Sequence, residues 1–128
     1  MFWYKTGIFV ITVIMVLFMI GVLKSSRQAK SRKPDLVKRH QRWVFALLTA
    51  TLLQIALIRG HVQIYGRGPR DALFTLHFTY AVGFFATLLA LLYFNGKRNP
   101  SQHAFLAMLC VTLFIAMVFL GIANTWRL

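Results

Sequence analysis

Any chemistry in this sequence would have to depend on histidine. The chain of 128 residues has one cysteine, two acidic residues and no glutamate. Both aspartates suit helix starts, so catalysis by paired carboxylates is excluded, and no Ser-His-Asp, Cys-His or phosphate-loop arrangement is evident. Neutral imidazole, by contrast, is a strong ligand for haem iron and binds copper and zinc. The candidate residues are the four histidines, His40, His61, His77 and His103.

Four apolar segments must position these histidines. Hydrophobic residues make up 59% of the chain, charged residues 13%, and the mean hydropathy is +0.66, which is typical of a protein whose solvent is lipid. A helix needs about 20 mostly apolar residues to cross a hydrocarbon layer of roughly 30 Å. None of the segments alternates polar and apolar residues as a barrel strand does. We therefore predict an all-α integral membrane protein with helices at about 8–23, 40–60, 72–94 and 102–123.

Short connections join the predicted helices. Residues 24–39 form a basic linker in which Pro34 suits the start of the second helix. Asp71 and Ser101 are suitable N-cap residues for the third and fourth helices. Because short links make consecutive helices antiparallel neighbours, we expect residues 1–128 to form one four-helix bundle of up-down topology.

Basic residues predict the orientation of this bundle. The net charge is +13, and ten of the fifteen Lys and Arg fall on the side of the predicted linker, eight of them within residues 24–42. Such an excess marks the cytoplasmic side, which places both termini on the periplasmic side. No polar domain remains to bind nucleic acid. We expect a multi-pass protein of the cell inner membrane, with the lipid bilayer as partner and the first apolar segment retained, since no small-residue cleavage site follows it.

The histidines fall at two depths in this topology. His40 and His103 belong to the cytoplasmic interface, whereas His61 and His77 lie toward the periplasmic face. On the second helix Gln54 falls between its two histidines in angle, so one polar stripe should face the bundle interior. Two histidines on facing helices can hold a b-type haem. We predict bis-histidine binding of one or two b haems, with His61 paired to His77 and His40 paired to His103.

Other residues admit two interpretations. Small, aromatic and basic side chains could line a haem: Gly83 and Ala81 as space for the ring, Tyr80, Phe84 and Phe85 at its edge, Arg39 or Arg70 at its propionates. The alternative is that the aromatic residues and Cys110 only pack, and that an interfacial histidine such as His40 only contacts water or lipid headgroups. A closed copper or zinc site is poorly served by two histidines per surface without Cys, Asp or Glu nearby.

The order of these residues is similar to that of a known family. Residues 38–42 (KRHQR), the sequence Arg59-Gly60-His61, a glycine-proline turn with Arg70, and then His77 and His103 resemble the bacterial membrane family named domain of unknown function 420, over roughly residues 38–125. The resemblance implies a respiratory setting, near oxidases and their assembly. The chain departs from the pattern in a shorter segment before His77 and in Ala104 after His103. The wider arrangement also resembles cytochrome b561 proteins, whose members carry two b haems and pass electrons between the two sides of a membrane.

Two functions therefore stand as hypotheses. The first is a b-type cytochrome that carries electrons across or along the membrane in a respiratory chain. The alternative is a non-enzymatic accessory subunit or assembly factor of a respiratory oxidase, with histidines that are incidental or handle haem or copper. A quinone site, in which His77 or His103 hydrogen-bonds a carbonyl, is compatible with either. In each case we expect an oligomer or a subunit of a larger assembly.

Overall fold

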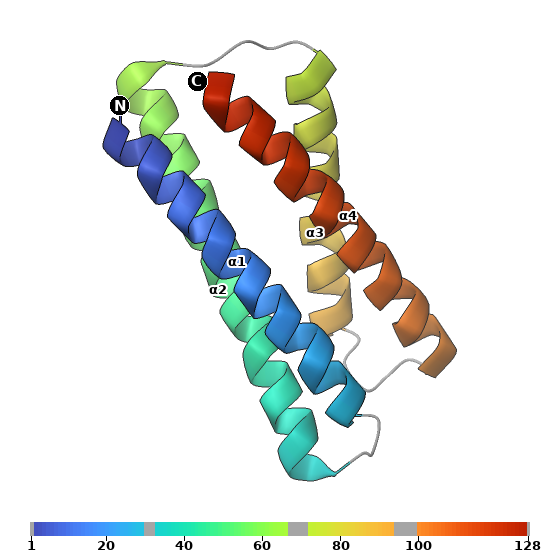
Figure 1. Ribbon diagram of the computed structural model, residues 1–128. Helices are drawn as coiled ribbons and strands as arrows, with labels where there is room; N and C mark the ends of the chain where they lie inside the picture. Colours follow the sequence, from blue (N-terminus) through green and yellow to red (C-terminus); the bar gives the residue numbers. More distant parts are fainter. Residues whose placement is uncertain (1, 30–32, 67–71, 94–99, 128) are drawn as a thin grey trace. The chain divides into compact units, whose positions relative to one another are not determined.

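The computed structural model describes residues 2–29, 33–66, 72–93 and 100–127, and these contain four α-helices (Figure 1). The helices are α1 (Phe2–Ala29), α2 (Pro34–Tyr65), α3 (Ala72–Tyr93) and α4 (Pro100–Arg127). Each contains an apolar stretch long enough to cross a membrane. The predictions of an all-α, multi-pass membrane chain are thus confirmed.

The chain divides into two compact units, each of them a pair of helices. Met1–Gly66 holds α1 and α2, and Arg67–Leu128 holds α3 and α4. In each unit the two helices are antiparallel and packed side by side (Figure 1), as a short connection requires. We call these units the first and the second hairpin. Their assembly into one bundle and the membrane side of each terminus remain predictions.

The first two helices are longer than predicted. Helix α1 continues to Ala29 and α2 begins at Pro34, so most of the predicted linker 24–39 is helical. Pro34 opens α2 as expected, and Asp35 in the first turn and Arg27 in the last turn of α1 complement the helix dipoles. Lysine and arginine are good helix formers, so a basic segment can continue a helix beyond the membrane.

Helix α2 ends at Tyr65, beyond the predicted end near residue 60, and the start of α4 differs from the predicted cap. Gly66 ends α2 with φ +84°, a left-handed conformation that glycine adopts without steric cost, and its N–H donates to the Val62 carbonyl at 3.0 Å. Helix α4 begins at Pro100, so Ser101 lies in the first turn and is not the N-cap that the sequence suggested. The predicted cap Asp71 and the predicted propionate partner Arg70 lie outside the described residues.

The first hairpin combines apolar packing with a polar link at mid-span. Its buried side chains include Met15 and Leu47. Gln54 of α2 donates through Nε2 to Thr12 Oγ1 at 2.8 Å and to the Ile8 carbonyl at 3.1 Å, both on α1. The polar stripe predicted for α2 therefore faces α1 at this level, as a membrane helix requires of an uncharged polar group.

The second hairpin is closely packed around small residues. A Cβ atom placed on Gly83 of α3 would lie 3.2 Å from Leu113 Cδ1 of α4. Next to this contact, Phe84 is fully buried against Phe114, with ring centroids 5.2 Å apart. Cys110 is also buried, in agreement with a packing role. Small residues let membrane helices approach closely and gain dispersion contacts.

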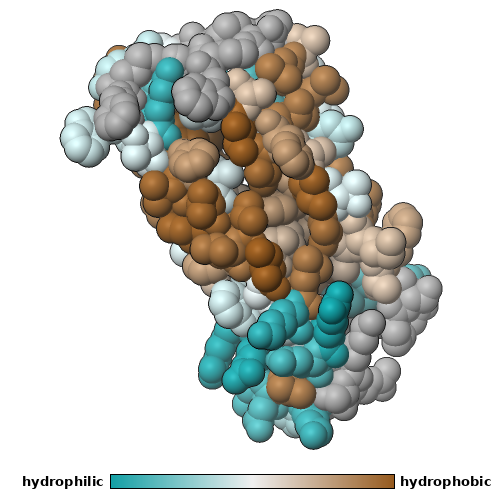
Figure 2. Space-filling view, in the orientation of Figure 1, coloured by the Kyte–Doolittle hydropathy of each residue, from teal (hydrophilic) through white to brown (hydrophobic). Residues whose placement is uncertain are grey.

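Large apolar side chains on all four helices face outward, as expected of a chain that is surrounded by lipid. Examples are Leu17 on α1, Phe45 on α2, Phe78 on α3 and Phe119 on α4. At the end of the first hairpin where α1 ends and α2 begins, hydrophilic side chains replace this apolar surface (Figure 2). The transition agrees with a helix pair that leaves the hydrocarbon at its basic end.

Candidate functional site

His61 is almost completely buried. It lies in the last turns of α2 and exposes 1% of its surface, whereas the other three histidines are only half-buried. Tyr4 of α1 meets the imidazole edge-on with ring centroids 5.8 Å apart, and Tyr65, one turn along α2, lies at 5.2 Å. Tyr4 also packs over Gly60, where a Cβ would lie at an ordinary contact distance of 3.4 Å from Tyr4 Cε1. The two tyrosine rings also contact each other at 5.7 Å, which encloses the imidazole on two sides.

The ring nitrogens of His61 lack hydrogen-bond partners. Both Nδ1 and Nε2 are buried, and neither is bonded to any group in the part of the chain that the structure describes. A neutral imidazole always carries one N–H donor and one acceptor lone pair. Leaving such a group buried and unsatisfied costs about 1–3 kcal/mol, so it usually marks a functional requirement or an absent partner. A metal, a ligand or a further polar group at His61 would offset this cost.

His77 on α3 occupies space that a glycine of α4 provides. A Cβ on Gly121 would lie 3.0 Å from His77 Cε1 and 3.5 Å from Nδ1. The ring has a hydrogen bond to the backbone of Met117, while Nδ1 is buried without a partner among the residues described. An imidazole that is oriented by a backbone hydrogen bond on one side and keeps a lone pair on the other is suited to bind a metal.

A polar contact anchors this part of α3 to α4. Asn124 Nδ2 donates to the Leu73 carbonyl at 3.3 Å and to the Leu120 carbonyl at 2.9 Å. Leu73 precedes His77 by about one turn, so the amide holds the two helices together close to the imidazole. Gly121 therefore contacts the His77 ring, and Asn124 holds the two helices together one turn away.

His40 has a hydrogen-bonding role between α1 and α2. Its Nδ1 lies 3.0 Å from Ser25 Oγ, and the Ser25 hydroxyl donates to the Val22 carbonyl at 3.0 Å. Since the serine hydrogen is used on Val22, the serine oxygen accepts from the Nδ1–H of His40. Ser25 is buried, with 2% of its surface exposed. His40 therefore joins the basic ends of the two helices and is more than a solvated headgroup contact.

The predicted histidine pairs both join one hairpin to the other. His40 and His61 belong to the first hairpin, and His77 and His103 to the second, where His103 is half-buried near the start of α4. Both pairings stay predictions. Across the described segments, no group of three or more His, Cys, Asp or Glu side chains comes together that could hold a metal ion.

Two of the residues predicted to line a haem, Gly83 and Phe84, instead pack against α4. The Leu113 side chain fills the space over Gly83, and Phe84 packs on Phe114. The expectation that Gly83 leaves room for a flat macrocycle is therefore wrong, because the facing helix occupies that room. The unsatisfied nitrogens of His61 and His77, in contrast, fit the requirements of axial ligands.

Sequence reasoning missed the neighbours that define two of the histidines. Tyr4 and Ser25 both lie on α1, which carries no histidine. Helical spacing shows which residues share a face of one helix, but it does not show which residues of another helix meet them. Gly60, directly before His61, was the one local indication that a large side chain approaches there.

Comparison of the chain with models of protein families, with curated proteins and with solved structures found no match. The likeness to the family of domain of unknown function 420 and to cytochrome b561 proteins therefore remains an expectation drawn from the order of the four histidines.

Proposed function

We propose that this protein is a b-type haem protein of a respiratory membrane that carries electrons, in which His61 and His77 would hold the haem iron. One observation carries the proposal: both imidazoles have buried nitrogens with no hydrogen-bond partner among the described residues. His40 is a weaker candidate, because neither of its nitrogens is among the buried, unpartnered atoms of the described residues. The pair at the predicted periplasmic face is therefore the first to test, ahead of His40 with His103.

Each residue of this site has a distinct task in the proposal. A bound haem supplies one-electron transfer between iron(II) and iron(III). Tyr4 and Tyr65 restrict rotation of the His61 ring and keep water from its nitrogens. Gly121 gives the His77 ring its space, and the Met117 backbone orients it. Restricted, dry imidazoles lose little conformational freedom when they bind a metal, which favours tight ligation.

An optical spectrum tests the proposal directly. Protein purified from haem-replete cells should show the Soret and α bands of low-spin haem b after reduction with dithionite. His61→Ala and His77→Ala should each abolish the bands of this haem, because six-coordinate low-spin iron needs both ligands. His103→Ala is the matched control and should keep them. Circular dichroism of each variant checks that the helices are retained.

The opposite pattern would remove the proposal. A colourless preparation from haem-replete cells contradicts it, as does loss of the bands in His103→Ala together with their retention in His61→Ala. If all three variants lose the haem bands and keep their helicity, haem binding requires His103 as well as His61 and His77. This result would contradict the pair proposed here.

The filled space at Gly83 favours a second candidate, an accessory subunit or assembly factor of a respiratory oxidase. Residues predicted to line a haem instead pack α3 against α4. In this case the four histidines are incidental to the association with the partner protein. Co-purification with a large oxidase, and its normal assembly after replacement of all four histidines, would select this candidate over the first.

A further inference from the structure

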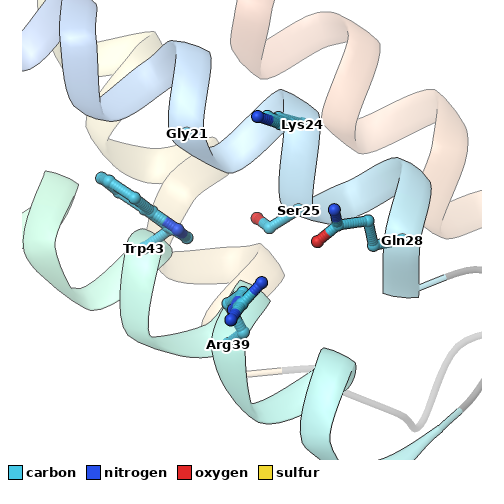
Figure 3. Close-up of a pocket in the computed structure, with 6 residues that line it drawn as sticks. All are labelled: Gly21, Lys24, Ser25, Gln28, Arg39 and Trp43. Carbon is cyan, nitrogen blue, oxygen red and sulfur yellow. The ribbon is translucent and has the colours of Figure 1, made fainter.

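A pocket lies between α1 and α2 at the basic end of the first hairpin (Figure 3). We call it the interfacial pocket; its volume is about 380 Å³. The pocket is open to the surface, and its two basic side chains, Lys24 and Arg39, are exposed. The six residues that line it are Gly21, Lys24, Ser25 and Gln28 from α1 with Arg39 and Trp43 from α2.

Two cations of this pocket have no carboxylate partner. Lys24 and Arg39 form no ion pair with any acidic side chain within the described segments. The whole chain offers two acidic residues to fifteen basic ones, so at least thirteen cations need counter-anions from their surroundings. At a membrane surface the available counter-anions are phosphates, above all those of anionic lipids.

The polar groups of the pocket suit a phosphate. The Arg39 guanidinium is directed from α2 toward α1, where Ser25 and Gln28 face it (Figure 3). A guanidinium binds phosphate oxygens through two parallel hydrogen bonds, and a nearby ammonium adds charge. The Ser25 hydroxyl hydrogen is already given to Val22, and its oxygen is bonded to His40. These two bonds fix the wall of the pocket behind the cations.

The apolar wall of the pocket indicates a lipid and not a free ion. Trp43 lies flat against Gly21, where a Cβ would come within 2.5 Å of the indole, and its ring meets Phe18 edge-on at 5.9 Å. Tryptophan prefers the level of the glycerol and headgroup in a bilayer. A phospholipid with its phosphate at Arg39 would have its glycerol and first methylene groups beside this ring, a contact that inorganic phosphate cannot make.

We propose that the interfacial pocket binds the headgroup of an anionic phospholipid, with Lys24 and Arg39 on the phosphate and Trp43 against the glycerol backbone. The site lies wholly within the first hairpin, so it does not depend on the haem proposal or on how the two hairpins assemble.

Quenching of Trp43 fluorescence by brominated lipid tests this site. Trp3→Phe and Trp126→Phe leave Trp43 as the single tryptophan. The protein is reconstituted in phosphatidylcholine vesicles that contain a rising fraction of brominated phosphatidylglycerol, and in a matched series with brominated phosphatidylcholine. Salt at 0.5 M screens diffuse attraction, because the Debye length then falls to about 4 Å. Half-maximal quenching should occur at a lower fraction of the anionic lipid.

Substitutions show which residues cause the preference for the anionic lipid. Arg39→Gln and Lys24→Gln should each lower it about fivefold, the effect expected of one basic residue that contacts an anionic headgroup. Arg39→Lys should keep most of it. Lys38→Gln is the matched control, since this exposed neighbour carries the same charge at the same level and does not line the pocket.

Three results would overturn the proposal. Equal quenching by the two lipids would show that the pocket has no headgroup preference. If Lys38→Gln and Arg39→Gln lower the lipid preference equally, the preference comes from diffuse charge and not from the pocket. The third result concerns free phosphate. If 10 mM inorganic phosphate changes Trp43 fluorescence in detergent, and Lys24→Gln and Arg39→Gln remove this change while the vesicles show no lipid preference, the ligand is free phosphate and not a lipid.

Discussion

The two hairpins join their helices by different contacts. In the first, polar side chains cross from one helix to the other, from Gln54 to Thr12 and from His40 to Ser25. In the second, glycines admit a large side chain from the facing helix, as Gly121 does for His77, and the polar link described above runs from the Asn124 side chain to the Leu73 backbone. Lipid offers no hydrophobic drive for helix association, so such local contacts decide how a hairpin pairs.

This difference shows what surrounds each histidine. His61 and His40 of the first hairpin are bordered by side chains that α1 contributes. His77 of the second hairpin is accommodated by the absence of a side chain at Gly121. The facing helix therefore supplies a neighbour that shapes each of these three environments, joined at His61 by Tyr65 of the same helix.

The largest effect expected is at Gly21, where the first hairpin also depends on close approach. Gly21→Ala would bring a methyl group within 2.5 Å of the Trp43 ring, so ring or helix must shift. We expect a loss of about 2 kcal/mol in the free energy of unfolding, measured by denaturant titration in micelles. Gly7→Ala on the same helix is the control, because its Cβ meets Leu57 at an ordinary 3.8 Å. Equal stability of the two variants would show that close packing is not required in this hairpin.

A smaller effect is expected from Gly121→Ala in the second hairpin. The added methyl group would lie 3.0 Å from the His77 ring, which cannot bend away as an alkyl chain can. We expect a loss of about 1 kcal/mol, together with a changed His77 signal in nuclear magnetic resonance spectra. Gly83→Ala should cost less than about 0.5 kcal/mol, since the Leu113 methyl group at 3.2 Å can rotate and the helix gains propensity. The reverse order would contradict the role assigned to Gly121.

The polar link at mid-span should contribute less again. A double-mutant cycle with Gln54→Leu and Thr12→Val should give a coupling energy of about 0.6 kcal/mol, typical of hydrogen bonds between membrane helices. Thr49 bonds only to the Phe45 carbonyl of its own helix, so Thr49→Val should show no coupling to Gln54. A coupling energy near zero between Gln54 and Thr12 would show that the polar contact of the first hairpin does not contribute to its stability.

Among the polar contacts, Ser25→Ala should have the smallest effect. It removes the acceptor of the His40 Nδ1–H at the end of the hairpin, where water can replace it, so we expect a loss of about 0.5 kcal/mol. The ¹⁵N chemical shift of Nδ1 should move at the same time, whereas Ser26→Ala should leave it unchanged. An unaltered Nδ1 resonance in Ser25→Ala would exclude the hydrogen bond.

The number and kind of helices could be predicted because hydrocarbon thickness and residue rise fix the length of an apolar run. The ends of α1 and α2 could not, since Lys24 to Ala29 has the composition of a loop and also of a helix that continues into water. Gly83 shows the same ambiguity in the core: a missing side chain leaves room for a ligand or for a neighbour, and here Leu113 takes it.

The candidate site was predictable only in its histidines. Their positions along the chain place them at the ends of the spans, and His77 stands out as the single histidine of a helix without Asp, Glu, Lys or Arg. Tyr4 and Ser25 are distant in sequence, and nothing in their spacing connects them to His61 or His40. Contacts between helices depend on rotation and offset, which a single sequence does not contain.

The unequal lengths of the helices bear on the membrane that this protein can inhabit. Helix α3 has 22 residues and is about 33 Å long, whereas α2, with 32 residues, reaches about 48 Å. In a bilayer a few ångströms thicker, α2 has spare turns whose long basic side chains can extend to the water. Helix α3 has almost none, so the lipid around it would have to compress. The shortest helix thereby sets the upper limit of bilayer thickness, and sterol-rich or otherwise thickened membranes should strain the second hairpin first.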